Sequence, residues 1–330
     1  MHLSLFYRYP DPDFHSIENI FNTLAGYLSK DITVKKVYAP YKSIGFINRL
    51  KIAFHARKNQ GDINHITGFN HFIAPFLKKN KTILTIHDVG SIKYGNFLKT
   101  WLLKLFWFTI PVKSVAYITV ISEFTKQELI KYTSVDEKKI RIIPNCVSPK
   151  FQYHEKKFNR RKPVILHIGT KTNKNLLRLI QALKFINSKL IIVGKLNNQQ
   201  KALLKTNNIE YKNYFNISDN ELIDLYEKAD IVSFVSSYEG FGMPVIEANA
   251  VGRVVLTSNI EPMNTVAANA ACKVNPYSVK DIREAIQNII KDDKLRNNLI
   301  QNGLENVKKY RPENIAKQYL DIYNELINKK

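Results

Sequence analysis

Residues 237–252 read Ser-Tyr-Glu-Gly-Phe-Gly-Met-Pro-Val-Ile-Glu-Ala-Asn-Ala-Val-Gly and carry the clearest structural signal in the chain. They follow the apolar, β-branched run Ile231–Val235, which is typical of a buried strand. Gly240 and Gly242 then predict a tight turn, and Pro244 stands near the first turn of the helix that follows. A strand that passes through a glycine turn into a helix is a unit of a parallel α/β sheet.

Two carboxylates flank this turn. Glu239 lies at the turn and Glu247 lies one to two helical turns beyond it, so both can face one pocket. Glycine lets the backbone approach a ligand, and the N–H groups that open a helix favour an anion. A carboxylate beside an anion site can accept hydrogen bonds from sugar hydroxyls. We therefore expect a ligand with both phosphate and sugar here, although acids are also common at ordinary helix starts.

The alternation of short apolar runs and helical patterns extends along the whole chain. In the first half we expect strands at Leu3–Tyr7, Ile32–Val37, Thr82–His87, Ser114–Ile121 and Ile140–Ile143, and helices at Ser16–Leu28 and Glu123–Tyr132. In the second half we expect strands at Val164–Ile168, Leu190–Val193, Ile231–Val235 and Val254–Thr257, and a capping box that starts a helix at Ser218–Glu221. The predicted fold class is α/β, with two Rossmann-like doubly wound domains that face a central cleft.

The segment Val147–Lys162 separates the two series. It is polar and basic and lacks apolar periodicity, which is typical of a linker between domains. We predict an N-terminal domain over residues 1–150 and a second domain over residues 151–310. Open α/β sheets bind ligands at the carboxyl ends of their strands, so the site residues must be sought in the loops there.

Composition excludes several classes of protein. The chain has 330 residues and 45% hydrophobic residues, which suits about two globular domains rather than a disordered chain. Its two cysteines, Cys146 and Cys272, indicate neither a disulfide framework nor a zinc site. The longest apolar stretch, Trp101–Val112, is too short to span a membrane, and the start lacks a signal-peptide pattern. We expect a cytoplasmic protein.

The net charge is unusual. The chain holds 50 Lys and Arg against 28 Asp and Glu, a formal charge of +22. Such a field attracts phosphate-rich partners, whether nucleic acid, anionic lipid or nucleotide. The alternative is a set of solvated lysines that reflects a general richness in Lys, Asn and Ile.

Segment 237–252 resembles the Glu-x7-Glu signature of the retaining, GT-B type glycosyltransferases of family 4, the group 1 enzymes. Their usual form is Glu-Gly-Phe-Gly-Leu-Pro followed by a Glu-Ala pair; here Met243 replaces Leu and Asn249 replaces a common Met. Further segments resemble the family in the expected order, namely His65–Gly68, Thr85–Asp88, Val120–Thr125, Gly169–Leu176 and Asp219–Asp230. The resemblance implies the GT-B fold, in which the C-terminal helix Pro312–Ile327, within residues 311–330, packs back on the N-terminal domain.

The resemblance also implies a role for each motif residue. Glu247 would hold the ribose hydroxyls of a nucleotide, Glu239 the donor sugar and Lys174 the diphosphate, while His87 would contact the sugar and help align the acceptor. The implied catalytic residues are His87, Glu239 and Lys174. The implied donor-binding residues are Gly169, Thr170, Lys171, Lys174, Gly240, Phe241, Gly242, Met243 and Glu247. The reaction would retain the anomeric configuration, use no metal and need no cofactor beyond its substrate, a UDP- or GDP-linked sugar.

Three positions depart from the family pattern. Thr170 stands where the family often has Arg as a second diphosphate clamp, a role that Lys171 or Lys195 could take over. Thr265 replaces a glutamate of the usual Pro-Glu-Val run. Cys146 stands where Gly is usual, and we interpret it as a packing variant because nothing nearby in the sequence would lower the pKa of its thiol.

The acceptor side is less defined. Four polar residues, Arg8, His15, Ser16 and Glu18, follow the first predicted strand, where this fold has an acceptor-facing loop. An acceptor-binding role and a helix-capping role explain them equally well. The glycine-rich loop common in the family is absent there, which is why the acceptor side is the least defined. Tyr214 and Phe215 could stack on a nucleobase or pack the domain, and packing is slightly favoured.

Two basic segments combine apolar and aromatic residues. Ser43–Lys58 places Ile44, Ile47, Leu50 and Phe54 at helical spacing beside four basic residues, and Leu98–Val112 is rich in Trp, Leu and Phe. Such segments can lie on an anionic bilayer, which would put the enzyme on the inner face of the plasma membrane. The alternative is that these apolar faces form the cores of two βαβ units.

The leading hypothesis is a bacterial glycosyltransferase that moves a sugar from a nucleotide sugar to a glycan or lipid-linked acceptor in surface polysaccharide assembly. A second is a basic nucleic-acid- or membrane-binding protein. Charge is the only support for nucleic acid, because no recognised nucleic-acid motif accompanies it and no specific nucleic acid is expected. A third is a GT-B scaffold with impaired catalysis, for which Thr170 and Thr265 are the hints.

Overall fold

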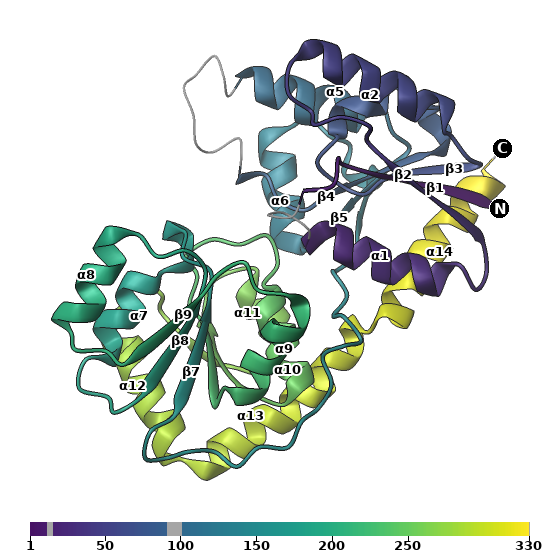
Figure 1. Cartoon of the computed structure of the whole chain (residues 1–330). Coiled ribbons are helices and arrows are strands. Elements are labelled where there is room, and N and C mark those ends of the chain that lie inside the picture. The colour runs from purple at the N-terminus through teal and green to yellow at the C-terminus, as the bar shows by residue number, and fades with distance from the viewer. Residues whose placement is uncertain (12–15, 91–100, 330) are drawn as a thin grey trace. The chain divides into compact units, whose positions relative to one another are not determined.

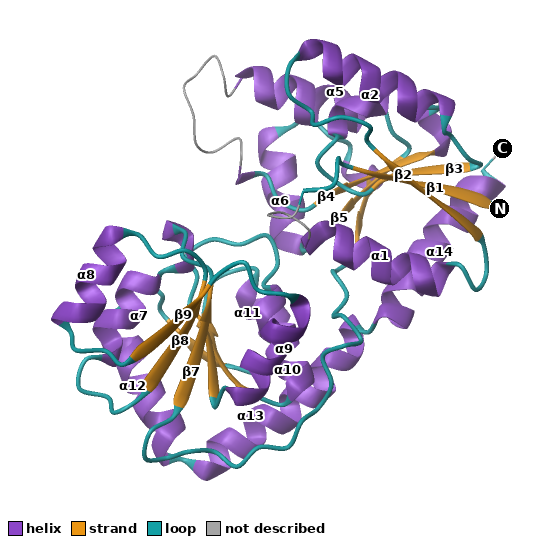
Figure 2. Ribbon diagram, viewed as in Figure 1, coloured by secondary structure: helices purple, strands orange, loops and turns teal. Residues whose placement is uncertain are grey.

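The structure is a computed structural model that describes residues 1–11, 16–90 and 101–329. The chain forms two compact units, one of Met1–Cys146 with Pro312–Lys330 and one of Val147–Arg311. Each unit holds a sheet between layers of helices, as Figure 2 shows. Within the described ranges, none of the helices is long and apolar enough to cross a membrane.

In the first unit, the described residues form a six-stranded parallel sheet in the order β2-β1-β3-β4-β5-β6. The strands are β1 (His2–Tyr7), β2 (Thr33–Tyr38), β3 (Ile63–Ile66), β4 (Thr82–Ile86), β5 (Tyr117–Val120) and β6 (Ile140–Ile142). β3, β4 and β5 are buried along their whole length. Helices on both faces of a parallel sheet account for this burial.

Two helices far apart in the sequence cover one face of this sheet. α1 (Ser16–Leu28) packs against α14 (Pro312–Asn328), so the last helix of the chain belongs to the first unit. Figure 1 shows α14 in yellow beside α1 in purple. The other face carries α2 (Phe46–Lys58), η1 (His71–Phe76), η3 (Lys104–Thr109) and α5 (Ile110–Lys113). α6 (Glu123–Tyr132), η2 (Lys79–Lys81) and η4 (Glu137–Lys139) complete the unit.

A buried polar network ties α14 to the sheet. His65 on β3 is fully buried, and its Nδ1 lies 2.6 Å from the Tyr323 hydroxyl of α14. Its Nε2 lies 2.7 Å from Thr85 Oγ1 on β4, which lies 2.6 Å from Thr119 Oγ1 on β5. Buried polar groups need such partners, so this network fixes how α14 sits on the strands.

The second unit also contains a six-stranded parallel sheet among the described residues, in the order β12-β11-β10-β7-β8-β9. The strands are β7 (Val164–Ile168), β8 (Lys189–Val193), β9 (Tyr211–Tyr214), β10 (Ile231–Phe234), β11 (Val254–Ser258) and β12 (Cys272–Val274). Read from β9, this is the doubly wound order 3-2-1-4-5-6 of dinucleotide-binding folds, whose order reverses between β7 and β10.

Helices cover both faces of the second sheet (Figure 2). One layer holds α7 (Leu176–Leu183), α8 (Asn198–Thr206) and α12 (Val279–Lys291), and the other holds α9 (Asp219–Lys228), α10 (Met243–Val251), α11 (Met263–Ala267) and α13 (Asp293–Asn306). Short turns η5 (Thr172–Lys174) and η6 (Val307–Tyr310) complete the unit. The predicted capping box is confirmed, because Ser218 and Glu221 bond each other's backbone N–H at the start of α9.

The structure confirms the predicted α/β class and adds strands that the sequence pattern missed. β3 carries the polar pair Asn64 and His65 at buried positions, and β9 reads Tyr-Lys-Asn-Tyr, so neither shows an apolar run. β12 has only three residues. The predicted strand Ser114–Ile121 was too long, since β5 covers only its middle.

Residues 147–162 form no helix or strand, and they are fastened along the second unit. Asp230 is 3% exposed, and its carboxylate accepts the N–H groups of Asn159 at 3.1 Å and Val164 at 2.8 Å. The same carboxylate pairs with Lys156. These contacts hold the predicted linker to the start of β7 and β10.

Candidate functional site

The loops that follow β7, β8 and β10 lie together because these strands are neighbours in the sheet. All three strands are parallel, so their carboxyl ends open onto the same edge. The loop after β7 contains Gly169 and Lys174, and the loop after β10 contains Glu239 and Gly242. This edge includes the point where the strand order reverses, which is where open α/β sheets bind ligands.

Gly169 makes room for Lys174. Its φ is 95°, and a Cβ atom there would lie 2.7 Å from Lys174 Cγ. The Lys174 side chain therefore runs across the Gly169 backbone, and its Nζ lies 4.9 Å from the ring centre of Phe234. This Nζ donates to Glu239 Oε1 at 2.6 Å, and the two side chains are 22% and 14% exposed. A cation and a carboxylate thus meet at the edge of the sheet with little solvent around them.

Two asparagines that the sequence argument missed hold this pair in place. Asn173 Nδ2 donates to the Tyr238 carbonyl at 2.9 Å, and the Asn173 carbonyl accepts the N–H of Ser237 at 2.8 Å. Asn175 is 4% exposed and adopts φ 63°, and its Nδ2 donates to the carbonyls of Val235 and Pro276. The available signal was the repeated Asn in residues 172–175, since Asn tolerates positive φ and bonds nearby backbone.

α10 begins at the glycine turn. Gly242 is its N-cap residue with φ 117°, which favours glycine, and it offers no side chain to cap the first turn. Phe241 is 4% exposed and packs edge-on against the ring of Tyr310, so only its backbone can serve a ligand. The backbone N–H groups that open a helix attract anions. Lys174 therefore stands in the loop next to a natural anion-binding helix end.

Glu247 lies on α10 in a part-buried position. The Tyr226 hydroxyl of α9 donates to its Oε2 at 2.5 Å, a contact that the sequence argument did not foresee. Burial raises the pKa of Glu247 to about 7, although Tyr226 and Lys174 both favour the charged form. The carboxyl group therefore changes charge near neutral pH.

The structure shows the contacts of Thr170 and Thr265, two of the positions that depart from the family pattern. Thr170 Oγ1 donates to the Lys195 carbonyl at 2.8 Å, and a Cβ on Gly194 would lie 2.9 Å from Thr170 Cγ2. Lys171 and Lys195 have exposed side chains. Near Thr265, the Glu261 carboxylate accepts the Thr265 N–H at 3.4 Å and the Asn264 amide at 3.2 Å. Glu261 therefore places a carboxylate just before α11, four residues ahead of Thr265, the position where the family usually has a glutamate.

The structure gives the exposure of three further residues that the sequence singled out, Tyr214, Phe215 and Cys146. Phe215 is 58% exposed and Tyr214 is partly buried, so packing does not explain Phe215. Cys146 is a free, buried cysteine, and burial raises the pKa of its thiol to about 12. A thiol with this pKa stays protonated at neutral pH.

In the first unit, His87 follows β4. Its Nε2 lies 2.8 Å from the carbonyl oxygen of Thr67, and because a carbonyl only accepts, Nε2 carries the proton and Nδ1 is the acceptor. Burial lowers the pKa of His87, which keeps the ring neutral at pH 7. Gly68 has φ 140°, and a Cβ there would lie 2.9 Å from His87 Cδ2. The glycine of the predicted motif thus makes room for the ring.

Of the four predicted acceptor residues, the structure describes Arg8, Glu18 and the backbone of Ser16. Arg8 and Glu18 form a two-point ion pair, with Nε to Oε1 at 2.6 Å and Nη2 to Oε2 at 2.9 Å, and both side chains are largely buried. The Arg8 guanidinium also lies 4.5 Å from the ring centre of Phe69. Ser16 begins α1, and His15 lies outside the described residues. The acceptor role of these residues stays a prediction.

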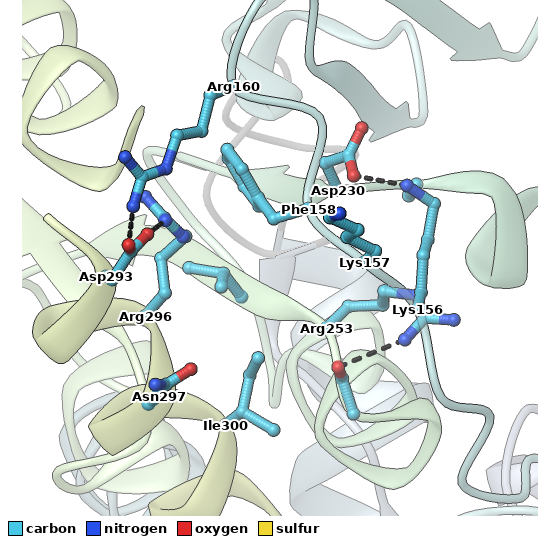
Figure 3. A pocket seen from close by; sticks show the side chains of 13 residues that line it. Lys156, Lys157, Phe158, Arg160, Asp230, Arg253, Asp293, Arg296, Asn297 and Ile300 are labelled. Carbon is cyan, nitrogen blue, oxygen red and sulfur yellow. Dashed lines mark hydrogen bonds and ion pairs between the residues drawn. The ribbon is translucent and has the colours of Figure 1, made fainter. Parts of the chain in front are cut away.

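A separate cavity of about 470 Å³ lies at the opposite, amino end of the second sheet (Figure 3). Its charged groups serve the fold. Arg253 is 3% exposed and donates to the carbonyls of five residues, which are His154, Tyr226, Glu227, Val251 and Gly252. Asp230 pairs with Lys156, and Asp293 pairs with both Arg160 and Arg296. In the part of the chain that the structure describes, no cluster of three or more His, Cys, Asp or Glu could hold a metal ion.

Two family models match consecutive parts of the chain. Residues 16–151 match the model described as glycosyltransferase family 4, and residues 150–306 match the model described as glycosyl transferases group 1. The chain belongs to the group 1 glycosyltransferases. Lys174, Glu239 and Glu247 fall inside the group 1 match, and His87 falls inside the family 4 match. The family expected from segment 237–252 is therefore confirmed.

Curated proteins with glycosyltransferase names are similar to large parts of the chain. It is 30% identical over 227 residues to the O-antigen chain mannosyltransferase RfbU of Salmonella typhimurium, a match that covers 66% of this chain and 63% of RfbU. It is 27% identical over 173 residues to the N,N'-diacetylbacillosaminyl-diphospho-undecaprenol alpha-1,3-N-acetylgalactosaminyltransferase of Campylobacter jejuni, covering 51% of this chain and 46% of that enzyme. The chain thus spans less than two thirds of the length of these relatives.

A solved structure shares the GT-B fold with this chain. The structure of Alr3699/HepE from Anabaena in complex with UDP and glucose has a TM-score of 0.76 and 13% sequence identity, and the match covers 98% of this chain and 100% of that one. At this identity the likeness concerns the fold alone, and it confirms the predicted architecture of two Rossmann-like units.

Proposed function

We propose that the protein moves a sugar from a nucleotide sugar to a glycan or lipid-linked acceptor in bacterial surface polysaccharide assembly. Membership of the glycosyltransferase family supports this. The names of two relatives support the acceptor class, one an O-antigen chain mannosyltransferase and the other a transferase whose name specifies a diphospho-undecaprenol. A cytoplasmic location suits the two free cysteines, which fit a reducing compartment.

The observation that carries the proposal is the Lys174–Glu239 pair beside the start of α10. A diphosphate that enters this edge meets the Lys174 ammonium and the backbone N–H groups of residues 241–243. Glu239 then accepts hydrogen bonds from the donor sugar, and Glu247 accepts them from the ribose. Both carboxylates are part-buried, which makes hydrogen bonds to hydroxyls stronger than in water.

The same groups can stabilise the departing nucleoside diphosphate. Negative charge develops on the leaving oxygen, and the Lys174 ammonium and the α10 N-terminus oppose that charge without a metal ion. His87 stays neutral and presents Nδ1 as an acceptor for a sugar hydroxyl. We propose retention of the anomeric configuration, as the family resemblance implies. The anomeric proton signals of donor and product in an NMR spectrum test retention directly.

Thermal unfolding with UDP, GDP, ADP and their common sugars tests the donor class. A ligand at about 100 times its Kd adds about 2.7 kcal/mol to the free energy of unfolding. We expect one nucleotide to raise the melting temperature, and we expect Glu247→Ala to remove this shift. Glu284→Ala is the matched control, because Glu284 is exposed on α12. If no nucleotide shifts the parent protein, the transferase proposal fails.

The charge of +22 supports a competing function, nucleic-acid binding. This alternative predicts oligonucleotide binding that weakens steeply with salt and no response to nucleotide sugars. An impaired scaffold is the other alternative, supported by Thr170 in place of the family Arg. Slow hydrolysis of the donor in the absence of an acceptor would contradict the scaffold.

A further inference from the structure

α2 in the first unit has two apolar faces. Its inner face packs into the core through Ile52, Ala53 and Ala56, each at most 2% exposed. At 100° per residue, Ile47 and Phe54 project from the opposite side of the helix, and they are 68% and 51% exposed. Phe46, the first residue of α2, is 74% exposed. One face is enough to bury a surface helix, so the second apolar face needs a separate explanation.

Residues 101–113 of the same unit carry further exposed apolar side chains, and residues 98–100 of the expected segment lie outside the described residues. Trp101, Leu102 and Phe106 are 52%, 42% and 49% exposed. The segment touches α2 directly, because the Arg49 guanidinium lies 4.6 Å from the ring centre of Trp107. α2 and α5 both pack against η1. We call the exposed set the outer apolar face, and it consists of Ile44, Phe46, Ile47, Phe54, Trp101, Leu102 and Phe106.

Cations accompany this face, and one of them, Lys42, pairs with Asp11 at 3.7 Å. Residues 41–58 contain Lys42, Arg49, Lys51, Arg57 and Lys58, and residues 101–113 contain Lys104 and Lys113. Neither segment contains Asp or Glu. Lys51, Arg57 and Lys58 are exposed and, by helical spacing, lie beside Ile47 and Phe54 on α2.

The combination of exposed apolar side chains and cations indicates which partner binds the outer apolar face. A second copy of the chain would bring two strongly basic faces together, which like-charge repulsion opposes. An anionic bilayer offers phosphates for the cations and an interface where Trp, Phe and Ile side chains are stable. We propose that α2 and residues 101–113 form a membrane-docking surface for anionic phospholipids. This inference goes beyond sugar transfer and does not depend on the donor.

Vesicle co-sedimentation tests the docking surface on the full chain. Vesicles of phosphatidylcholine with about 30% phosphatidylglycerol supply the anionic surface, and pure phosphatidylcholine vesicles are the neutral comparison. We expect binding to the anionic vesicles that weakens with salt. Phe46→Glu with Ile47→Glu should weaken this binding on the order of 100-fold, because two large apolar side chains no longer leave water. Lys51→Gln with Arg57→Gln and Lys58→Gln should remove the preference for phosphatidylglycerol.

Phe185→Glu is the matched control, because Phe185 is 90% exposed and lies in the second unit. It should bind vesicles as the parent does. Ile44→Glu, at a 72% exposed position before α2, is a milder second test if the double variant fails to fold. The nucleotide-induced melting shift should be the same in all variants, which separates this proposal from the proposed function.

Three results would overturn the docking surface. The parent protein could ignore anionic vesicles, or the apolar variants could bind them as tightly as the parent. Alternatively, the apolar variants could change the molar mass measured by light scattering without changing vesicle binding, which would assign the face to a second copy of the chain. Any of these outcomes is sufficient.

Discussion

At the scale of single residues, Lys174 has two partners in our proposal: Glu239 in the free protein and the diphosphate of the donor. The pair is satisfied without a ligand, and a diphosphate would compete with Glu239 for the ammonium. We predict that Lys174→Met weakens binding of a nucleoside diphosphate by about 10–100-fold, the usual worth of a hydrogen bond to a charged group. Nucleoside binding should change little. Titration calorimetry of both ligands measures the difference, and Lys184→Met, an exposed change in the same unit, should leave both affinities as they are.

Glu247 predicts a pH dependence with a definite sign. Its folded pKa of about 7 lies above the ordinary value near 4.3, so the folded protein binds a proton more tightly than the unfolded chain. This group therefore adds stability below pH 4.3 that is lost as pH rises through 7. Glutamine does not ionise, so the Glu247→Gln variant does not lose this stability as pH rises. We expect its melting temperature to exceed that of the parent above pH 7 by about 2–4 °C for each kcal/mol recovered, and to match it more closely at pH 5. If Glu247→Gln and the parent differ in melting temperature by the same amount at both pH values, the raised pKa of Glu247 is contradicted.

At the scale of elements, the turn from β7 into α7 depends on Asn175. Its side chain satisfies two carbonyls, and its backbone adopts the left-handed region. Asn175→Ala should lower the free energy of unfolding of the second unit by about 2–5 kcal/mol, through unpaired carbonyls and backbone strain. Asn175→Gly should recover only about 1 kcal/mol of this, because it removes the strain alone. Urea denaturation followed by circular dichroism measures the series, and equal losses in the two variants would show that the backbone angle is unimportant.

α14 makes a comparable prediction for the first unit. Tyr323→Phe leaves His65 Nδ1 without its partner in a dry environment. We expect the first unit to lose about 1–3 kcal/mol of unfolding free energy. Hydrogen exchange resolves the loss by unit, and it should appear in α14 and β3. Tyr153→Phe, at a 57% exposed position in the second unit, should stay within about 0.5 kcal/mol of the parent.

At the scale of the whole molecule, buried histidines predict how the two units respond to acid. Burial lowers the pKa of His65 to about 3 and of His71 to about 4, and it also lowers the pKa of His87 in the same unit. The second unit has His167, with a pKa of about 4. Below pH 6.5 these histidines bind protons in the unfolded chain but stay neutral in the folded protein. The free energy of unfolding therefore falls as pH falls.

The first unit should therefore lose more stability than the second between pH 7.5 and pH 5. Glu247 strengthens the contrast, because its raised pKa favours the second unit at low pH. Scanning calorimetry at the two pH values, with hydrogen exchange to assign the transitions, measures the difference. An equal loss in both units would show that the histidines do not dominate acid sensitivity.

The sequence alone determined the α/β class, most strands, the glycine turn at residues 240–242 and the family. These features rest on local signals: apolar runs, capping residues and the freedom of glycine. Helix α1 (Ser16–Leu28) and helix α6 (Glu123–Tyr132) appear with the predicted bounds for the same reason. The motif residues Lys174, Glu239 and Glu247 could also be named in advance, although their roles remain predictions.

Only the tertiary structure decided which groups meet. Asn173 and Asn175 gained importance because parallel strands bring separate loops to one edge of the sheet. Tyr226 gained importance because α9 packs beside α10 and brings its hydroxyl to Glu247. β3 was hidden from the sequence because Asn64 and His65 are buried through hydrogen bonds rather than through apolar character. The amphipathic pattern of α2 likewise did not say which face is covered. Periodicity reports that a face is apolar, and only packing decides whether that face meets the core or the solvent.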